Sequence, residues 1–125
     1  MSRRERDKGV RGEREVLEIL TRAGFTVRGL EATGDHLAFG RGLVLHVESK
    51  RQETARPWAW WEQAEPETPE GAMTVVAFRR SRSRWLALVD LEALADALLD
   101  PDTRSPGEQE ARRELIASSR IVAKP

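Results

Sequence analysis

The sequence predicts an α/β domain in which helices flank one mixed, five-stranded sheet. Five short segments have the apolar alternation or the composition of strands, and apolar residues recur at helical spacing in the segments around them. The chain has 125 residues, of which 39% are hydrophobic, so it has material for one small core. We expect residues 1–100 to form this domain, including a basic N-terminal arm, and residues 101–125 to form a loosely ordered helical tail.

The helices and strands are each expected from a local signal. Val16, Leu17 and Leu20 share one face of the first helix, which ends before Gly24. The helices are expected at residues 8–23 and 56–64, and after the capping residue Asp90 with the apolar face Leu91, Leu94, Ala95 and Leu98. The strands are expected at residues 25–30, 35–39, 43–50, 74–78 and 85–89.

Basic residues gather in two places although the formal net charge is +0. One cluster occupies the first 14 residues, and the other is the connection at residues 79–84. Such clusters are typical of a phosphate-binding surface, and they are equally typical of two solvated arginine-rich segments. The neutral total therefore does not exclude nucleic acid as a partner.

The composition excludes several classes of protein. Cysteine is absent, so disulfides, thiolate metal ligands and a cysteine nucleophile are excluded. No apolar segment approaches the roughly 20 residues of a membrane helix, and the N-terminus lacks the apolar stretch of a secretory signal. We therefore expect a cytoplasmic protein, in the host cytoplasm if the source is a phage. Asn and Cys are both thermolabile and both absent, which suits a thermophilic source.

The strand at residues 43–50 carries an acid and a base on one face. Alternation places Leu45 and Val47 on one side of this strand, and Glu48 and Lys50 on the other. Glu48 and Lys50 then project in the same direction, about 6–7 Å apart along the strand. Such a pair suits both a functional site and a solvent-facing ion pair at a strand end.

Asp35 is expected to lie opposite Glu48 across a hairpin. If residues 41–42 form a two-residue loop, Gly40 pairs with Leu43, and counting back places Asp35 opposite Glu48. Directly opposed side chains share a face, with Cβ atoms about 4.5–5.5 Å apart. Two carboxylates this close repel each other unless a cation lies between them or one is protonated.

These residues predict a site for a hard divalent cation, Mg²⁺ or Mn²⁺. Asp35 and Glu48 would hold the ion, with the main-chain carbonyl of Ser49 as a third oxygen ligand. The ion would polarise a phosphate and activate a water, while Lys50 would orient that water or stabilise charge on the phosphate. Glu13 falls on the apolar face of the first helix, where it would complete the metal shell or bind a second ion; alternatively, it lies too early in that helix to be buried.

The acids and the lysine form the pattern D-x(12)-E-x-K, which resembles the PD-(D/E)xK nuclease motif. Residues 8–15 (KGVRGERE), 34–40 (GDHLAFG) and 45–50 (LHVESK) are similar, in order and spacing, to archaeal-type Holliday junction resolvases, the Hjc-like family. The similarity extends over about residues 8–96. Gly34 stands where the motif name has proline, and the segment after residue 50 departs from the family pattern.

This resemblance implies a restriction-endonuclease-like fold and a Mg²⁺-dependent homodimer that resolves four-way DNA junctions in recombination and repair. The catalytic set that it implies is Glu13, Asp35, Glu48 and Lys50. The candidate DNA contacts are Arg3, Arg4, Arg6, Lys8, Arg11, Arg14, Thr33 and Arg51. Two alternatives stay open: a nuclease of this fold with another DNA target, and a DNA-binding module that does not cleave.

Two further features have more than one interpretation. Trp58 and Trp61 lie on one face of a short helix with Trp60 to the side, an arrangement that suits the core or a subunit interface better than base stacking. His46 lies on the same face of the strand as Glu48. It is therefore expected either near the metal or as a partly buried strand residue without a functional role.

Overall fold

The computed structural model describes residues 3–30, 35–99, 110–111 and 113–117, with the backbone alone at residues 5–8. The helical elements are α1 (Arg3–Ala23), α2 (Pro57–Ala64), the 3₁₀ turn η1 (Glu65–Glu67) and α3 (Leu91–Ala97). The strands are β1 (Thr26–Gly29), β2 (His36–Gly40), β3 (Leu43–Arg51), β4 (Met73–Arg79) and β5 (Leu86–Leu88). The strands form one five-stranded sheet, which confirms the predicted fold class.

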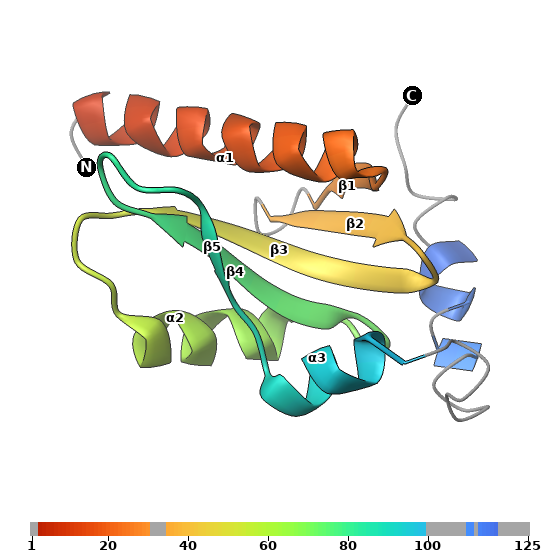
Figure 1. Cartoon of the computed structure of the whole chain (residues 1–125). Helices are drawn as coiled ribbons and strands as arrows, with labels where there is room; N and C mark the ends of the chain where they lie inside the picture. The colour runs from red at the N-terminus through yellow and green to blue at the C-terminus, as the bar shows by residue number, and fades with distance from the viewer. Residues whose placement is uncertain (1–2, 31–34, 100–109, 112, 118–125) are drawn as a thin grey trace.

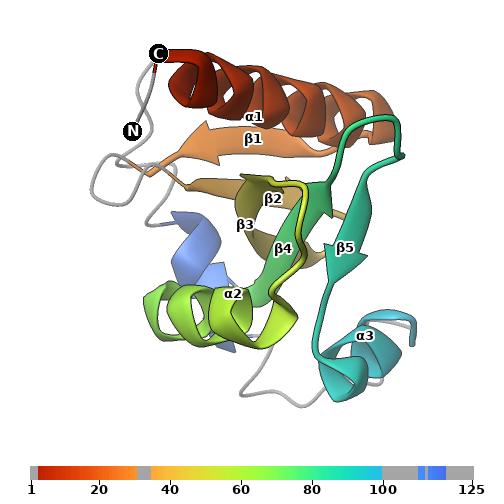
Figure 2. The same cartoon turned by 90° about the vertical axis from the view of Figure 1, so that its left-hand side faces the viewer.

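The sheet lies between α1 on one face and α2 on the other, as Figures 1 and 2 show. Its strand order is β1-β2-β3-β4-β5. All neighbours are antiparallel except β3 and β4, which are parallel. A parallel pair cannot be joined by a tight turn, so the chain crosses over through α2 and η1 before it enters β4.

The hairpin between β2 and β3 has the predicted two-residue turn. Arg41 and Gly42 both adopt positive φ angles, 53° and 73°, as the favoured hairpin turn requires. The strands pair from Gly40 with Leu43 back to His36 with Val47, which is the predicted register. This short turn therefore fixes which face of the sheet each side chain of β2 and β3 occupies.

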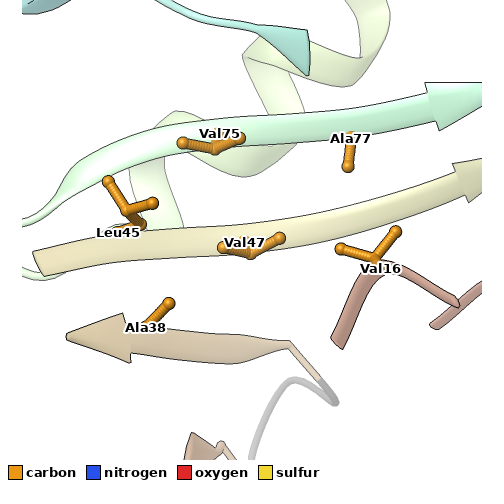
Figure 3. Packing of buried hydrophobic residues seen from close by; sticks show 6 residues of the cluster. All are labelled: Val16, Ala38, Leu45, Val47, Val75 and Ala77. Carbon is orange, nitrogen blue, oxygen red and sulfur yellow. The ribbon is translucent and has the colours of Figure 1, made fainter. Parts of the chain in front are cut away.

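The core consists of two apolar clusters, one on each face of the sheet. The larger lies under α1 and contains Val16, Ala38, Leu45, Val47, Val75 and Ala77 (Figure 3). The smaller lies under α2 and contains Trp60, Ala64 and Val76. Of the three tryptophans of α2, Trp60 is thus the core residue, whereas Trp58 is 77% exposed. The interpretation of Trp58 as a core residue is therefore wrong, and its place at a subunit interface stays a prediction.

Two helices differ from the prediction in instructive ways. Helix α1 begins at Arg3, not at residue 8, because Arg and Glu are good helix formers even where no apolar pattern marks them. Helix α3 is capped as predicted, since the Asp90 side chain accepts the Ala93 N–H. Its apolar face is not buried, however, because Leu91 and Leu98 are 77% and 78% exposed.

Of the predicted tail, residues 110–111 and 113–117 are helical, and the remaining tail residues lie outside the described part of the chain. The connection between the first two predicted strands, residues 31–34, also lies outside it. Within the described residues, no helix has the length and apolarity that a membrane crossing requires.

Candidate metal centre

Asp35 and Glu48 meet where β2 begins and β3 approaches its end. The last pair of the β2–β3 ladder joins His36 to Val47, so the next position places Asp35 opposite Glu48, as the sequence predicts. Both residues are buried, with exposed fractions of 9% and 8%. Burying two acidic side chains together is unfavourable unless cations or hydrogen-bond donors compensate for their charge.

Glu67 adds a third carboxylate to this pair. One carboxylate oxygen from each of Asp35, Glu48 and Glu67 lies within 4.8 Å of the other two. Glu67 is the last residue of η1, so the α2–η1 crossover carries it to the site. Its side chain is exposed, whereas the other two are buried. The group is therefore half embedded in the sheet and open on one side to a ligand.

The Glu48 carboxylate has one satisfied and one unsatisfied oxygen. Its Oε1 lies 2.9 Å from the ammonium of Lys50. Its Oε2 is buried and has no hydrogen-bond partner among the described residues. A buried acceptor without a partner is costly, and a carboxylate oxygen is a preferred ligand of Mg²⁺ and Mn²⁺. The donor set and this unsatisfied oxygen fit a hard divalent cation.

Lys50 is held between the sheet and α2. Its Nζ donates to the Gln63 side-chain oxygen at 3.1 Å and also pairs with Glu48. The lysine side chain is only 16% exposed, so its ammonium is largely shielded from solvent. These two contacts place a positive charge directly beside the carboxylate group. The same-face arrangement of Glu48 and Lys50 predicted from the strand pattern is confirmed.

His46 links Asp35 to the segment that follows η1. Its ring is fully buried, with Nε2 3.1 Å from Asp35 Oδ2 and Nδ1 2.8 Å from Thr68 Oγ1. Thr68 Oγ1 also lies 3.1 Å from the Ala64 carbonyl oxygen, and which neighbour receives its one proton depends on the His46 tautomer. Thr68 also bonds Thr74 Oγ1 at 2.7 Å. Asp35 is therefore fixed by a hydrogen-bonded chain that runs into the crossover next to Glu67.

The remaining predicted ligands are placed differently. Glu13 is exposed on α1, the helix that covers the opposite face of the sheet, and it is not part of the carboxylate group formed by the described residues. Ser49 lies between Glu48 and Lys50 on β3, where its side chain points to the α1 face. The role of its main-chain carbonyl as a metal ligand stays a prediction.

The predicted DNA contacts fall into three groups. Arg3, Arg4, Arg11 and Arg14 are exposed on α1. Arg51 lies at the end of β3, where its guanidinium is 3.4 Å from a Glu53 carboxylate oxygen. The side chains of Arg6 and Lys8, and the whole of Thr33, lie outside the described residues.

Four residues of the site were not found from the sequence: Gln63, Glu67, Thr68 and Thr74. The only available signal was the run of acidic residues at positions 62–70. Nothing in that run distinguishes Glu67 from its neighbours. Its position depends on how the crossover packs against the sheet, which is a tertiary property.

Comparison with protein-family models gives no match, and comparison with curated proteins gives none either. Among solved structures, the chain is similar to Hjc, a Holliday junction resolvase from the archaeal hyperthermophile Archaeoglobus fulgidus. The TM-score is 0.54 at 24% sequence identity, and the match covers 63% of this chain and 73% of the resolvase chain. The likeness shows a shared fold: a mixed sheet flanked by helices.

Proposed function

We propose that this protein is a Mg²⁺-dependent endonuclease that hydrolyses phosphodiester bonds in DNA. The observation that carries the proposal is the carboxylate group of Asp35, Glu48 and Glu67, with the unsatisfied Glu48 oxygen in it and Lys50 beside it. Phosphoryl transfer is catalysed by a divalent ion that carboxylates hold, and by a nearby ammonium group that stabilises negative charge on the phosphate. Mn²⁺ has the same ligand preference and would serve as a substitute ion.

Asp35, Glu48 and Glu67 would hold the ion, together with the Ser49 carbonyl. When bound, the ion supplies polarisation of the phosphate and activation of a water. Because Glu13 lies outside this carboxylate group, on the helix that covers the other face of the sheet, we keep only its second predicted role, as a ligand of a second ion. His46 and Thr68 keep Asp35 oriented, and Gln63 keeps Lys50 in place.

Lys50 is assigned the role of a fixed positive charge beside the reacting phosphate. In hydrolysis, the water oxygen bonds to phosphorus, the bond from phosphorus to one sugar oxygen breaks, and that oxygen takes a proton. Negative charge on the phosphate oxygens is stabilised by an ammonium that is already in position and largely shielded from water. Lys50 also orients the attacking water through its remaining N–H group.

The four-way DNA junction is the substrate that we propose. Two observations support it: the similar fold is that of a Holliday junction resolvase, and motif residues 8–15, 34–40 and 45–50 resemble that family. Resolution requires cuts in two opposed strands, so we propose that the working form is a homodimer. The exposed arginines of α1 would contact DNA phosphates.

The direct test uses an end-labelled four-way junction and a matched linear duplex, each with Mg²⁺ and with EDTA. We expect paired, Mg²⁺-dependent nicks in the junction and an intact duplex. Equal cutting of both DNAs would retain the nuclease site but assign the protein to general DNA processing. Tight binding to the junction without cutting in Mg²⁺ or Mn²⁺ would replace the proposal with a binding module.

A further inference from the structure

The connection between β4 and β5 lies at the same end of the sheet as the carboxylate group. Strands β3 and β4 are parallel and pair Glu48 with Val76 and Arg51 with Arg79, so both strands end there. The connection at residues 80–84, here called the arginine turn, follows immediately. Figure 1 shows it projecting at the end of the sheet where β3 also finishes. The turn and the carboxylate group therefore share this end of the sheet.

The conformation of the arginine turn is held by side chains. The Glu53 carboxylate, just beyond β3, accepts the Ser81 N–H at 3.0 Å and the Ser81 hydroxyl. Ser83 Oγ accepts the Arg80 N–H at 3.1 Å. Arg82 adopts a φ of 64°, in the region that favours glycine. The turn is thus bound to the segment that follows β3 and is held in a defined shape.

The arginines of the turn differ from their neighbours in how their guanidinium groups are paired. Within the described residues, no carboxylate pairs with the side chain of Arg80, Arg82 or Arg84. The neighbouring arginines differ, because Arg79 binds Glu15 at 3.0 Å and Arg51 binds Glu53. Arg80, Arg82 and Arg84 are all exposed. Three positive charges are therefore concentrated on one short turn beside the site.

Helix α1 extends this basic surface. It approaches the same end of the sheet closely, because a Cβ on Gly12 would lie 3.2 Å from the Arg51 Cβ and 3.3 Å from the Trp85 ring. The Glu15 carboxylate accepts a hydrogen bond from Trp85 Nε1 at 2.8 Å. The side of α1 that carries Glu15 therefore faces the start of β5, next to the arginine turn. Arg11 is four residues before Glu15, on the same flank of the helix, and it is exposed.

We propose that the arginine turn, together with Arg11, binds the sugar-phosphate backbone of a DNA duplex arm and positions it beside the metal centre. This inference rests on the proposed function, whose site it extends. Arginine suits the role because its planar guanidinium binds phosphate oxygens with two parallel hydrogen bonds. A turn held in shape by Glu53 presents these groups with less loss of freedom on binding than a flexible segment would.

The test compares two arginine-containing turns at opposite ends of β3. In the test variant, Arg80→Gln and Arg82→Asn remove two charges from the arginine turn. In the control variant, Arg41→Asn removes a charge from the β2–β3 turn, where φ is 53° and the side chain is also exposed. Asn tolerates positive φ, so both variants preserve turn geometry. Circular dichroism and thermal unfolding establish that each variant is folded.

Binding is measured by fluorescence anisotropy with a labelled four-way junction and a matched duplex, in EDTA, over a range of salt concentrations. For the test variant we expect binding to weaken about tenfold or more, and the slope of log Kd against log salt to fall by about 1–2. The control variant should keep the wild-type affinity and slope. A lysine variant, Arg80→Lys with Arg82→Lys, should restore most of the slope because it restores the charge.

The outcomes separate this inference from the proposed function. Wild-type affinity and slope in the folded test variant overturn the inference, even if the wild type cuts junctions. An equal loss in the control variant overturns it as well, since the effect is then one of net charge. The expected loss in a protein that never cleaves supports the inference and rejects the nuclease. No binding of either DNA by the wild type overturns both.

Discussion

On the α1 face of the sheet, Leu45 and Val47 of β3 pack into an apolar cluster, whereas on the α2 face the same strand buries His46 and Glu48. The first face follows the ordinary rule that apolar side chains fill the core. The second departs from it, because a buried carboxylate with an unsatisfied oxygen opposes folding. If the proposed function is correct, adjacent residues of one strand serve stability and catalysis separately, and substitutions on the two faces should have separable effects.

The largest effect is expected on the α2 face. Asp35→Asn and Glu48→Gln should each reduce cleavage of the four-way junction by about 10²–10³-fold or more, because each removes a charged metal ligand. Junction binding in EDTA should be unchanged. Single-turnover cleavage with excess protein measures the chemical step. Undiminished cutting by either variant would show that the metal centre is wrongly assigned.

The opposite pattern is expected on the α1 face. Leu45→Ala should lower the free energy of unfolding by about 2–4 kcal/mol, because it leaves a cavity in the larger cluster. Urea denaturation measures this loss, which is a large part of the stability of a small domain. The cleavage rate per folded molecule should stay within about twofold of wild type. A rate loss that matches the loss for Asp35→Asn would contradict the separation of the two faces.

The third prediction concerns Glu67, the carboxylate that the crossover between β3 and β4 contributes to the site. Glu67→Gln should weaken Mn²⁺ binding by about tenfold, because the site loses one of its three carboxylates. Isothermal titration calorimetry or the electron paramagnetic resonance signal of free Mn²⁺ gives the affinity without any need for activity. Glu62→Gln is the matched control, since Glu62 is exposed on α2 and outside the carboxylate group. Equal affinities of the two variants would remove Glu67 from the centre.

The smallest effect is expected at Gln63. Gln63→Leu keeps the size of the side chain but removes the acceptor that holds Lys50. The cleavage rate should fall about three- to tenfold with little change in Mn²⁺ affinity, because Lys50 keeps its ion pair with Glu48. A parallel loss of Mn²⁺ affinity would mean that Gln63 acts on the carboxylates and not on the lysine.

Much of this site could be predicted from the sequence because its geometry is local. Strand alternation places Glu48 and Lys50 on one face, and a two-residue turn gives the register that brings Asp35 opposite Glu48. Both predictions need only the pairing of neighbouring strands. Both predicted acids belong to the carboxylate group that the structure shows.

The remainder depended on packing between distant segments. The position of Glu67 requires the crossover to be docked on the sheet, and the sequence around it contains several equivalent acids. The exposure of Leu91 and Leu98 likewise could not be inferred, because the apolar pattern of a helix does not show whether another element packs against it. Tertiary context, not local propensity, decided these cases.

The parallel pairing of β3 with β4 has a consequence for the order of folding. Asp35 and Glu48 are brought together by a hairpin with a two-residue turn, which closes quickly and at low entropic cost. We expect Glu67 to join them only after the longer crossover has closed and β4 has paired with β3. A cation held by all three carboxylates would therefore favour the completed sheet over the isolated hairpin. Its concentration would then help to determine how completely the chain folds.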